Sequence, residues 1–167
     1  MKSVLLLPLA LVLLVCTAQA AGPAVSRSDF LDALWQYAGS LPHSAGGVFF
    51  DVGRDDDGST AISWAQEMGV TQGTGNGCFS PRRPITREEA ALMLRRYAEY
   101  LGRDTFLPDG LLTCNDGAEA SPWAGDALYW AADRGLIDWT PEGQLDPQGT
   151  LTPEQLEHIL ARFFGDQ

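Results

Sequence analysis

Apolar and polar residues alternate with a helical period between Thr86 and Leu101. One face carries Ala90, Met93, Leu94, Tyr97, Ala98 and Leu101. This spacing predicts an amphipathic helix with one buried face. Thr86 and Glu89 have the spacing of a capping box, and Gly102 suits the C-terminal end, so we expect the helix to fill this interval.

The same pattern occurs before and after this helix. A shift of 66 residues aligns about thirty positions without a gap, beginning where Trp64-Ala65 meets Trp130-Ala131. A shift of 60 residues toward the N-terminus brings the segment 25–29 onto 85–89. We therefore predict two full units and the second half of an earlier one. The repeated helices are expected to begin near Ser26, Thr86 and Thr152.

Each full unit also opens with a predicted helix. Ser59 or Thr60 is expected to cap the first, and Ser121, with a proline directly after it, is expected to start the second. Trp64 and Trp130 lie at helical spacing with other apolar residues, which favours core packing over ligand binding.

Gly, Pro and turn-forming residues dominate the connectors 70–84 and 136–150. Each connector contains one apolar anchor, Phe79 or Leu145, so we expect ordered loops held at that residue. The segments between units, 40–58 and 103–120, are either hinges or segments that fold back onto the helices. Their apolar residues favour the second interpretation: Phe49, Phe50, Val52, Phe106, Leu107, Leu111 and Leu112.

The N-terminus has the three parts of a secretory signal peptide. Lys2 precedes an apolar run from Val4 to Val15, and cleavage is expected after Ala20. The run is shorter than the roughly 20 residues of a membrane span, so an uncleaved anchor is the weaker alternative. A lipoprotein at Cys16 is weaker still, because Val15 is a poor match to the small residue that such processing favours. We expect a secreted protein without a transmembrane segment after cleavage.

Composition restricts the partners. Without residues 1–20, ten arginines face 22 acidic residues, a net charge of −12. This balance argues against nucleic-acid binding, which needs a basic surface. Two cysteines remain, and in an exported chain Cys78 and Cys114 are either bridged or separate thiols. With two histidines they have no zinc-ligand spacing, so we predict no metal site and no cofactor.

Several motifs of the middle unit resemble the S-layer homology family. They are Phe49-Phe50-Asp51, Ala61 to Ala65, Glu67 to Val70, Gly73, Gly77 to Pro81 and above all Ile85-Thr86-Arg87-Glu88-Glu89-Ala90, which is similar to the family's Thr-Arg-Ala-Glu signature. In the last unit Phe106 and Asp109 match Phe49 and Asp51 at a longer spacing, and Pro153 replaces Arg87.

The resemblance implies an all-α fold, a pseudo-threefold array of helix-loop-helix repeats around a central three-helix bundle. One prong is missing here, because only half of the first unit is present. We expect one domain at 21–167 after the signal peptide, with a partial repeat at 21–40 and full repeats at 47–102 and 104–165.

The resemblance also implies a function at the bacterial cell wall or cell surface. Family members attach without covalent bonds to a secondary cell-wall polysaccharide, often one bearing a pyruvate ketal, through grooves between units. No enzyme is implied. The ligand-binding residues expected here are Arg87, Arg27, Asp51, Gly73, Trp123 and Trp139.

Arg27 and Arg87 carry most of this prediction. A cation in the first turn opposes the helix dipole, which costs about 0.3–1 kcal/mol, so something other than helix stability places it there. A guanidinium beside free helix amides suits a ketal carboxylate. The alternative is that both are solvated surface residues paired with Asp55, Asp56, Asp57 or a first-turn acid. Trp123 and Trp139 lie near loops, where aromatic faces can stack on sugars.

Other chemistry has little support in the sequence. Asp55-Asp56-Asp57-Gly58 fails as an EF-hand loop, because Gly53 and Trp64 fall where carboxylates are needed. No nucleophilic triad, phosphate loop or distinct carboxylate pair is visible, so we predict no catalytic residues. A second hypothesis remains: a structural protein, or one that binds other envelope proteins, which has lost polymer binding. The net charge and the missing prong favour it.

Overall fold

The computed structural model describes residues 22–44, 46, 47, 49–107 and 116–165. These residues form five α-helices and no β-strand, so the predicted all-α class is confirmed. The helices are α1 (Arg27–Tyr37), α2 (Ser59–Glu67), α3 (Arg87–Tyr100), α4 (Gly125–Asp133) and α5 (Pro153–Gly165), with a 3₁₀ turn η1 (Gly117–Glu119) before α4. The predicted signal peptide and Cys114 lie outside the described residues.

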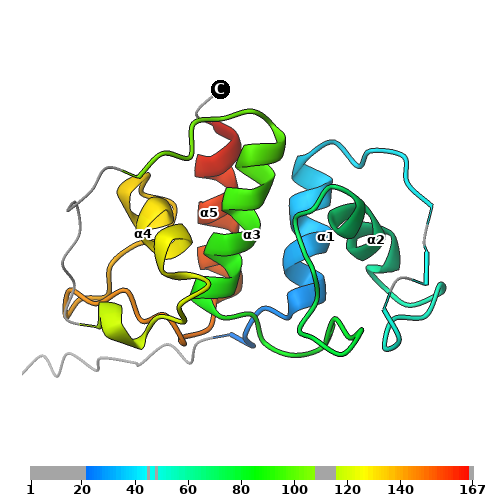
Figure 1. Ribbon diagram of the computed structural model, residues 1–167, viewed down its shortest axis with the longest axis horizontal. Coiled ribbons are helices and arrows are strands. Elements are labelled where there is room, and N and C mark those ends of the chain that lie inside the picture. The colour runs from blue at the N-terminus through cyan, green and yellow to red at the C-terminus, as the bar shows by residue number, and fades with distance from the viewer. Residues whose placement is uncertain (1–21, 45, 48, 108–115, 166–167) are drawn as a thin grey trace, which may run out of the picture.

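The second helices of the units, α1, α3 and α5, stand side by side in the middle of the molecule (Figure 1). α2 packs against α1 on one flank, and α4 packs against α3 on the other. The first helix of each full unit therefore packs on the second helix of the preceding unit. The pseudo-threefold relation between units remains a prediction.

Backbone hydrogen bonds tie the starts of the three central helices together. The Val25 N–H donates to the Leu151 carbonyl at 2.9 Å, and the Ile85 N–H donates to the Val25 carbonyl at 2.9 Å. Thr86 and Thr150 form an antiparallel bridge. At the opposite end, aromatic rings of all three helices meet, with ring centroids 5.6 Å apart for Tyr37–Phe164 and 5.9 Å apart for Tyr97–Phe163.

Capping confirms the predicted starts of α1 and α3 and corrects those of α2 and α4. Both Ser26 and Thr86 form complete capping boxes. The N-caps of α2 and α4 are Gly58 and Ala124, without side-chain bonds, so the predicted serine and threonine caps are wrong. The serine hydroxyls are used elsewhere: Ser59 donates to the Arg54 carbonyl and Ser121 donates to Glu88.

The predicted core residues are buried. Trp64 and Trp130 are 1% and 3% exposed, and the connector anchors Phe79 and Leu145 are fully buried. The segment before α2 folds back through buried Phe49, while Phe106 after α3 is 68% exposed. In the described part of the chain, no helix has both the length and the apolar composition needed to cross a membrane.

Candidate functional site

Arg27 leaves the first turn of α1 and holds the connector of the following unit. Its Nε–H donates to the Phe79 carbonyl at 2.9 Å, and the guanidinium carbon lies 4.6 Å from the centroid of the Phe79 ring. Its Nη1 lies 3.0 Å from Oε1 of Glu89. Burial lowers the pKa of Arg27 and Glu89 opposes that shift, so the guanidinium stays charged.

Arg87 repeats this arrangement one unit later. Its Nε–H donates to the Leu145 carbonyl at 2.7 Å, and its Nη2 donates to the Asp138 carbonyl. The side chains of Arg27 and Arg87 are 2% and 5% exposed, so the alternative of solvated surface residues is wrong for both. At the equivalent position of α5 stands Pro153. Among the described residues there is no third connector that an arginine at this position would hold.

An aspartate holds each connector from the opposite side. The Asp51 carboxylate accepts from the Phe79 N–H at 2.8 Å and the Ser80 N–H at 2.7 Å. Desolvation raises the pKa of Asp51, but these two bonds and the nearby Arg27 outweigh it and lower the pKa. The structure therefore gives Asp51 a positioning role beneath the connector.

Asp116, and not Asp109, takes this role in the last unit, so the predicted match of Asp109 with Asp51 is wrong. The Asp116 carboxylate accepts from the Leu145 N–H at 3.1 Å and the Asp146 N–H at 2.6 Å. The sequence contains a signal for this: Asp51 precedes its anchor by 28 residues, and Asp116 precedes Leu145 by 29. Asp109 itself lies outside the described residues.

Glu88, which replaces alanine of the signature, is 2% exposed. It accepts from the N–H and hydroxyl of Ser121, both at 2.8 Å, and from Nε2 of Gln148 at 2.9 Å. A buried carboxylate needs such donors. This departure from the family pattern therefore joins α3 to the lead-in of α4 and to the second connector.

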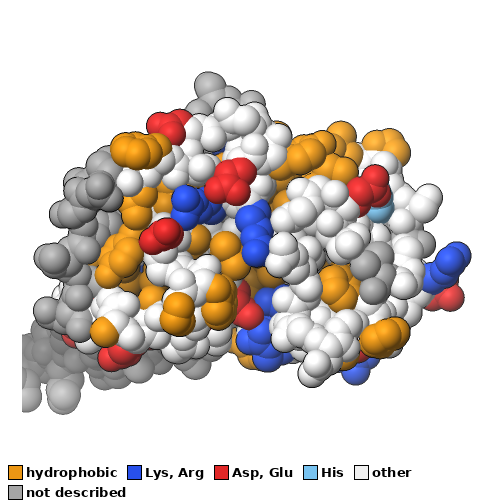
Figure 2. Space-filling view, viewed as in Figure 1, with side chains coloured by type: hydrophobic (Ala, Val, Ile, Leu, Met, Phe, Trp, Pro, Cys, Tyr) orange, Lys and Arg blue, Asp and Glu red, His pale blue; other side chains and the backbone are white. Residues whose placement is uncertain are grey.

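A groove lies between α1, α3 and the first connector, with a volume of about 360 Å³. We call it the arginine groove. Figure 2 shows this face, with basic side chains along the furrow between the lobe that contains α2 and the lobe that contains α4. Its lining residues are Arg27, Thr71, Gln72, Gly73, Thr74, Arg83, Glu89, Leu92, Met93, Arg96 and Trp123.

Charge in the arginine groove is positive, because three arginines face one carboxylate. Glu89 is shared between Arg27 and Arg83, with Arg83 Nη2 at 2.5 Å. Desolvation raises the pKa of Glu89, but the two arginines outweigh it and lower the pKa. The half-buried Arg96 has no hydrogen bond or ion pair to any described residue. Among the described arginines of this groove, Arg96 alone has all its donors available to a ligand.

Gly73 lines the groove at a position where the backbone requires glycine. Its φ is +81°, a conformation that favours glycine. A Cβ would also lie 2.4 Å from the Cys78 carbonyl oxygen and 2.6 Å from a carbon of the Phe49 ring. Trp123, 54% exposed, also lines the groove.

The second connector is different. Trp139 stands in the position of Gly73 and is 39% exposed, and Asp138 stands in the position of Gln72. The Asp138 carboxylate pairs with Arg162, the equivalent of Arg96, at 2.8 Å. The predicted residues are therefore not all brought together. Three of them, Arg27, Gly73 and Trp123, line the arginine groove. Trp139 lies in the second connector, to which Arg87 of α3 is bonded, and Asp51 is bonded to the backbone of the first connector.

Sequence reasoning missed Arg83, Arg96 and the bridging role of Glu89. Arg96 had a signal, since it aligns with Arg162 under the shift of 66 residues. Arg83 had none, because only the fold brings a connector residue beside Arg27. No group of three or more His, Cys, Asp or Glu side chains arranged to hold a metal ion occurs among the residues that the structure describes.

Comparison with known proteins gives a consistent result. The profile described as "S-layer homology domain" matches residues 49–91 and 115–156. The endoglucanase of Bacillus sp. (strain KSM-635) is 31% identical over 138 residues, which are 83% of this chain and 14% of that protein. Exoglucanase XynX of Acetivibrio thermocellus is 28% identical over 136 residues, 81% of this chain and 12% of that protein.

Cell surface glycoprotein 1 of Acetivibrio thermocellus is 30% identical over 93 residues, 55% of this chain and 4% of that protein. The chain thus spans 14% or less of the length of these relatives. The second profile match begins at residue 115, which agrees with the position of Asp116 and not with that of Asp109.

Proposed function

Because this chain belongs to the S-layer homology family, we propose that it is an exported cell-envelope protein that binds a secondary cell-wall polysaccharide without covalent bonds. Domains of this family are non-catalytic anchoring modules, and the family and relatives such as cell surface glycoprotein 1 are associated with the cell surface. The enzymes among the relatives are many times longer than this chain.

The observation that carries the proposal is the arginine groove. An acidic chain with a net charge of −11 gathers three arginines around one carboxylate there, and leaves Arg96 without a partner among the described residues. A guanidinium binds a carboxylate in bidentate fashion, as a pyruvate ketal on the polymer requires. Trp123, which also lines this groove, is an exposed aromatic side chain on which a sugar ring can stack.

Of the grooves expected between repeat units, the arginine groove is the one that we propose to have all its walls. Its walls come from α1, α3, the first connector and the lead-in of α4. At the second connector Asp138 already neutralises Arg162, so an anion gains less there. We therefore place the polymer in the arginine groove through Arg96, Arg27 and Trp123, with Gly73 and Asp51 shaping the connector.

Calorimetry with purified pyruvylated polymer tests this placement. Arg96→Gln removes the available cation without touching a described hydrogen bond, and we expect affinity to fall about 10- to 100-fold, as for loss of a charged pair. Arg54→Gln, at an exposed position outside the groove, is the control with the same change in charge. Equal affinity of the two variants contradicts the site assignment.

A second candidate is a structural protein, or one that binds other envelope proteins, without polymer affinity. The net charge of −11 favours it, because a negative protein repels an anionic polymer at long range. Co-sedimentation with cell-wall sacculi separates the two candidates. A protein that stays in the supernatant at physiological salt supports the second candidate.

A further inference from the structure

A second cluster of arginines lies at the C-terminal ends of the helices, away from the arginine groove. Arg103 follows α3, Arg134 follows α4, and Arg162 lies in the last turn of α5. They line a pocket of about 290 Å³, to which Asp104 contributes the single carboxylate among the described lining residues. We call this the helix-end pocket.

Two of these arginines are anchored by one edge. The Arg103 Nη1 donates to the Phe163 carbonyl at 2.6 Å, and its guanidinium carbon lies 4.6 Å from the centroid of the Phe163 ring. The Arg162 Nη1 donates to the Gly135 carbonyl and to Asp138. Neither side chain uses its Nε and Nη2 toward a described residue. Arg103 therefore presents an oriented edge that fits the two oxygens of a carboxylate, whereas the charge of Arg162 is already paired with Asp138.

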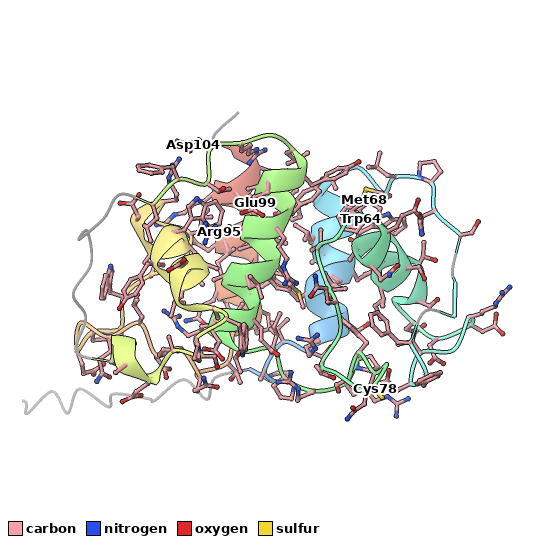
Figure 3. All side chains as sticks on the ribbon, viewed as in Figure 1. Trp64, Met68, Cys78, Arg95, Glu99 and Asp104 are labelled. Atoms are coloured by element: carbon pink, nitrogen blue, oxygen red, sulfur yellow. The ribbon has the colours of Figure 1, made fainter. Side chains whose placement is uncertain are left out.

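Arg134 completes the cluster through weak pairs. Its Nη2 lies 3.4 Å from Asp104 and its Nε lies 3.7 Å from Asp133, and its side chain is 41% exposed. Exposed pairs of this kind contribute about 0–1 kcal/mol, so a ligand can replace them at little cost. Figure 3 shows Asp104 beyond the end of α3, with Arg95 and Glu99 on the same helix below it.

The remaining walls of the pocket are apolar. Ala98, Leu136 and Phe163 line it together with Trp130. Trp130 is 3% exposed, and its Nε1–H has no hydrogen-bond partner among the described residues. A buried donor without a partner costs about 1–3 kcal/mol. The pocket thus combines a free arginine edge with apolar walls, and Trp130 in one of these walls carries an unused donor.

We propose that the helix-end pocket binds a small organic carboxylate, a lactyl-type group whose apolar carbons contact the walls while Arg103 and Arg134 bind its oxygens. Apolar walls disfavour phosphate, which is more strongly hydrated, and Asp104 repels a second negative charge on the ligand. This site does not depend on polymer binding in the arginine groove.

The test is an NMR titration of the ¹⁵N-labelled protein with sodium lactate at constant ionic strength, up to about 50 mM, since one carboxylate is expected to bind in the millimolar range. The indole N–H resonance of Trp130, assigned with Trp130→Phe, is the readout. We expect a saturable shift of this resonance and an apparent Kd at least fivefold weaker in Arg134→Gln.

Two comparisons make the result specific. Arg96→Gln alters the arginine groove alone and must leave the lactate response of Trp130 unchanged, whereas Arg103→Gln must weaken it. If Arg103→Gln does not fold, Arg134→Gln decides, because its side chain makes only exposed pairs. No saturable shift, an equal response in Arg134→Gln, or an equal response to sodium phosphate at the same ionic strength overturns the proposal.

Discussion

Arg27 and Arg87 start their helices against the sign of the helix dipole, and their hydrogen bonds show what offsets that cost. Each guanidinium turns away from its own helix and binds carbonyl oxygens of the next connector. Hydrogen bonds to a charged donor contribute about 1.5–3 kcal/mol, more than the unfavourable dipole term. Their recurrence therefore has a structural explanation, and the functional argument moves to Arg96.

The first prediction separates these two roles. Arg87→Gln leaves the Leu145 and Asp138 carbonyls without their charged donor, so we expect the free energy of unfolding to fall by about 2–4 kcal/mol. Urea unfolding measures it. Arg96→Gln, which breaks no described bond, is expected to change stability by less than about 0.5 kcal/mol. Comparable losses in both variants contradict this division of roles.

Gly73 gives a second prediction at this scale. In Gly73→Ala, an alanine must adopt the positive φ of this position and its Cβ lies 2.4 Å from the Cys78 carbonyl oxygen. We therefore expect the free energy of unfolding to fall by at least about 2 kcal/mol. Gly75→Ala is the matched control. Its φ is +107°, but nothing lies within 4 Å of the added Cβ. The difference in unfolding midpoints isolates the clash, and an equal loss at both glycines argues against it.

At the scale of elements, each connector is an ordered loop between two charged groups. The first is held by Arg27 on one side and Asp51 on the other, and the second by Arg87 and Asp116. These contacts fix the backbone that forms one wall of the arginine groove. The shape of the groove therefore depends on these charged contacts, and the contacts that involve carboxylates depend on pH.

The third prediction follows from the lowered pKa values of Asp51 and Glu89. A carboxyl group whose pKa is lower in the folded state contributes stability that is full above its unfolded pKa, about 4, and is lost as pH falls through the folded value. We expect urea midpoints to be level from about pH 7 to 5 and to fall below about pH 4.

Substitution identifies the groups responsible. The amide of Asp51→Asn does not titrate in acid and cannot accept from both N–H groups as the carboxylate does. We therefore expect a lower urea midpoint at neutral pH and a shallower fall of this midpoint in acid than in the unaltered protein. Asp55→Asn, in the exposed loop before α2, is the control. If Asp51→Asn and Asp55→Asn give the same acid profile, the connector contact is not what titrates.

At the scale of the whole molecule, α5 differs from α1 and α3 at one equivalent position. Leu31 of α1 and Ala91 of α3 are fully buried on helices that carry α2 and α4. The equivalent residue of α5 is Glu157, which is exposed and accepts from the Tyr37 hydroxyl at 2.5 Å. At this position α5 is thus polar where α1 and α3 are apolar, which suits contact with water.

The fourth prediction compares glutamine at two equivalent positions, residue 91 of α3 and residue 157 of α5. Ala91→Gln inserts a polar group into a closed contact, and we expect a loss of at least about 2–3 kcal/mol. Glu157→Gln keeps an oxygen acceptor at the surface and is expected to cost less than about 0.5 kcal/mol. Thermal unfolding of the pair is the measurement. A large loss for Glu157→Gln indicates that α5 carries a partner on this face.

Local interactions explain why so much of the fold is visible in the sequence. The capping boxes at Ser26 and Thr86, the buried periodic face of α3, and the anchors Phe79 and Leu145 all follow from neighbouring residues. The predicted caps were wrong where the hydroxyl donates elsewhere: Ser59 donates to the Arg54 carbonyl five residues before it, and Ser121 donates to Glu88, 33 residues before it. Capping preferences do not include such competing acceptors, and that of Ser121 is also distant in sequence.

By itself, the sequence determined the helical class and the repeated units, because periodicity, capping and repeat spacing can be read from the chain alone. It also named Arg27, Gly73 and Trp123, but that they line one groove came from the structure. Only the tertiary structure decided that Arg27 and Arg87 are buried, that Asp116 replaces Asp109, and that Arg83 and Arg96 join one groove. Burial and charge pairing depend on residues that are distant in sequence: Arg27 and Arg87 bind carbonyl oxygens 52 and 58 residues away, and Asp116 binds an N–H 29 residues away.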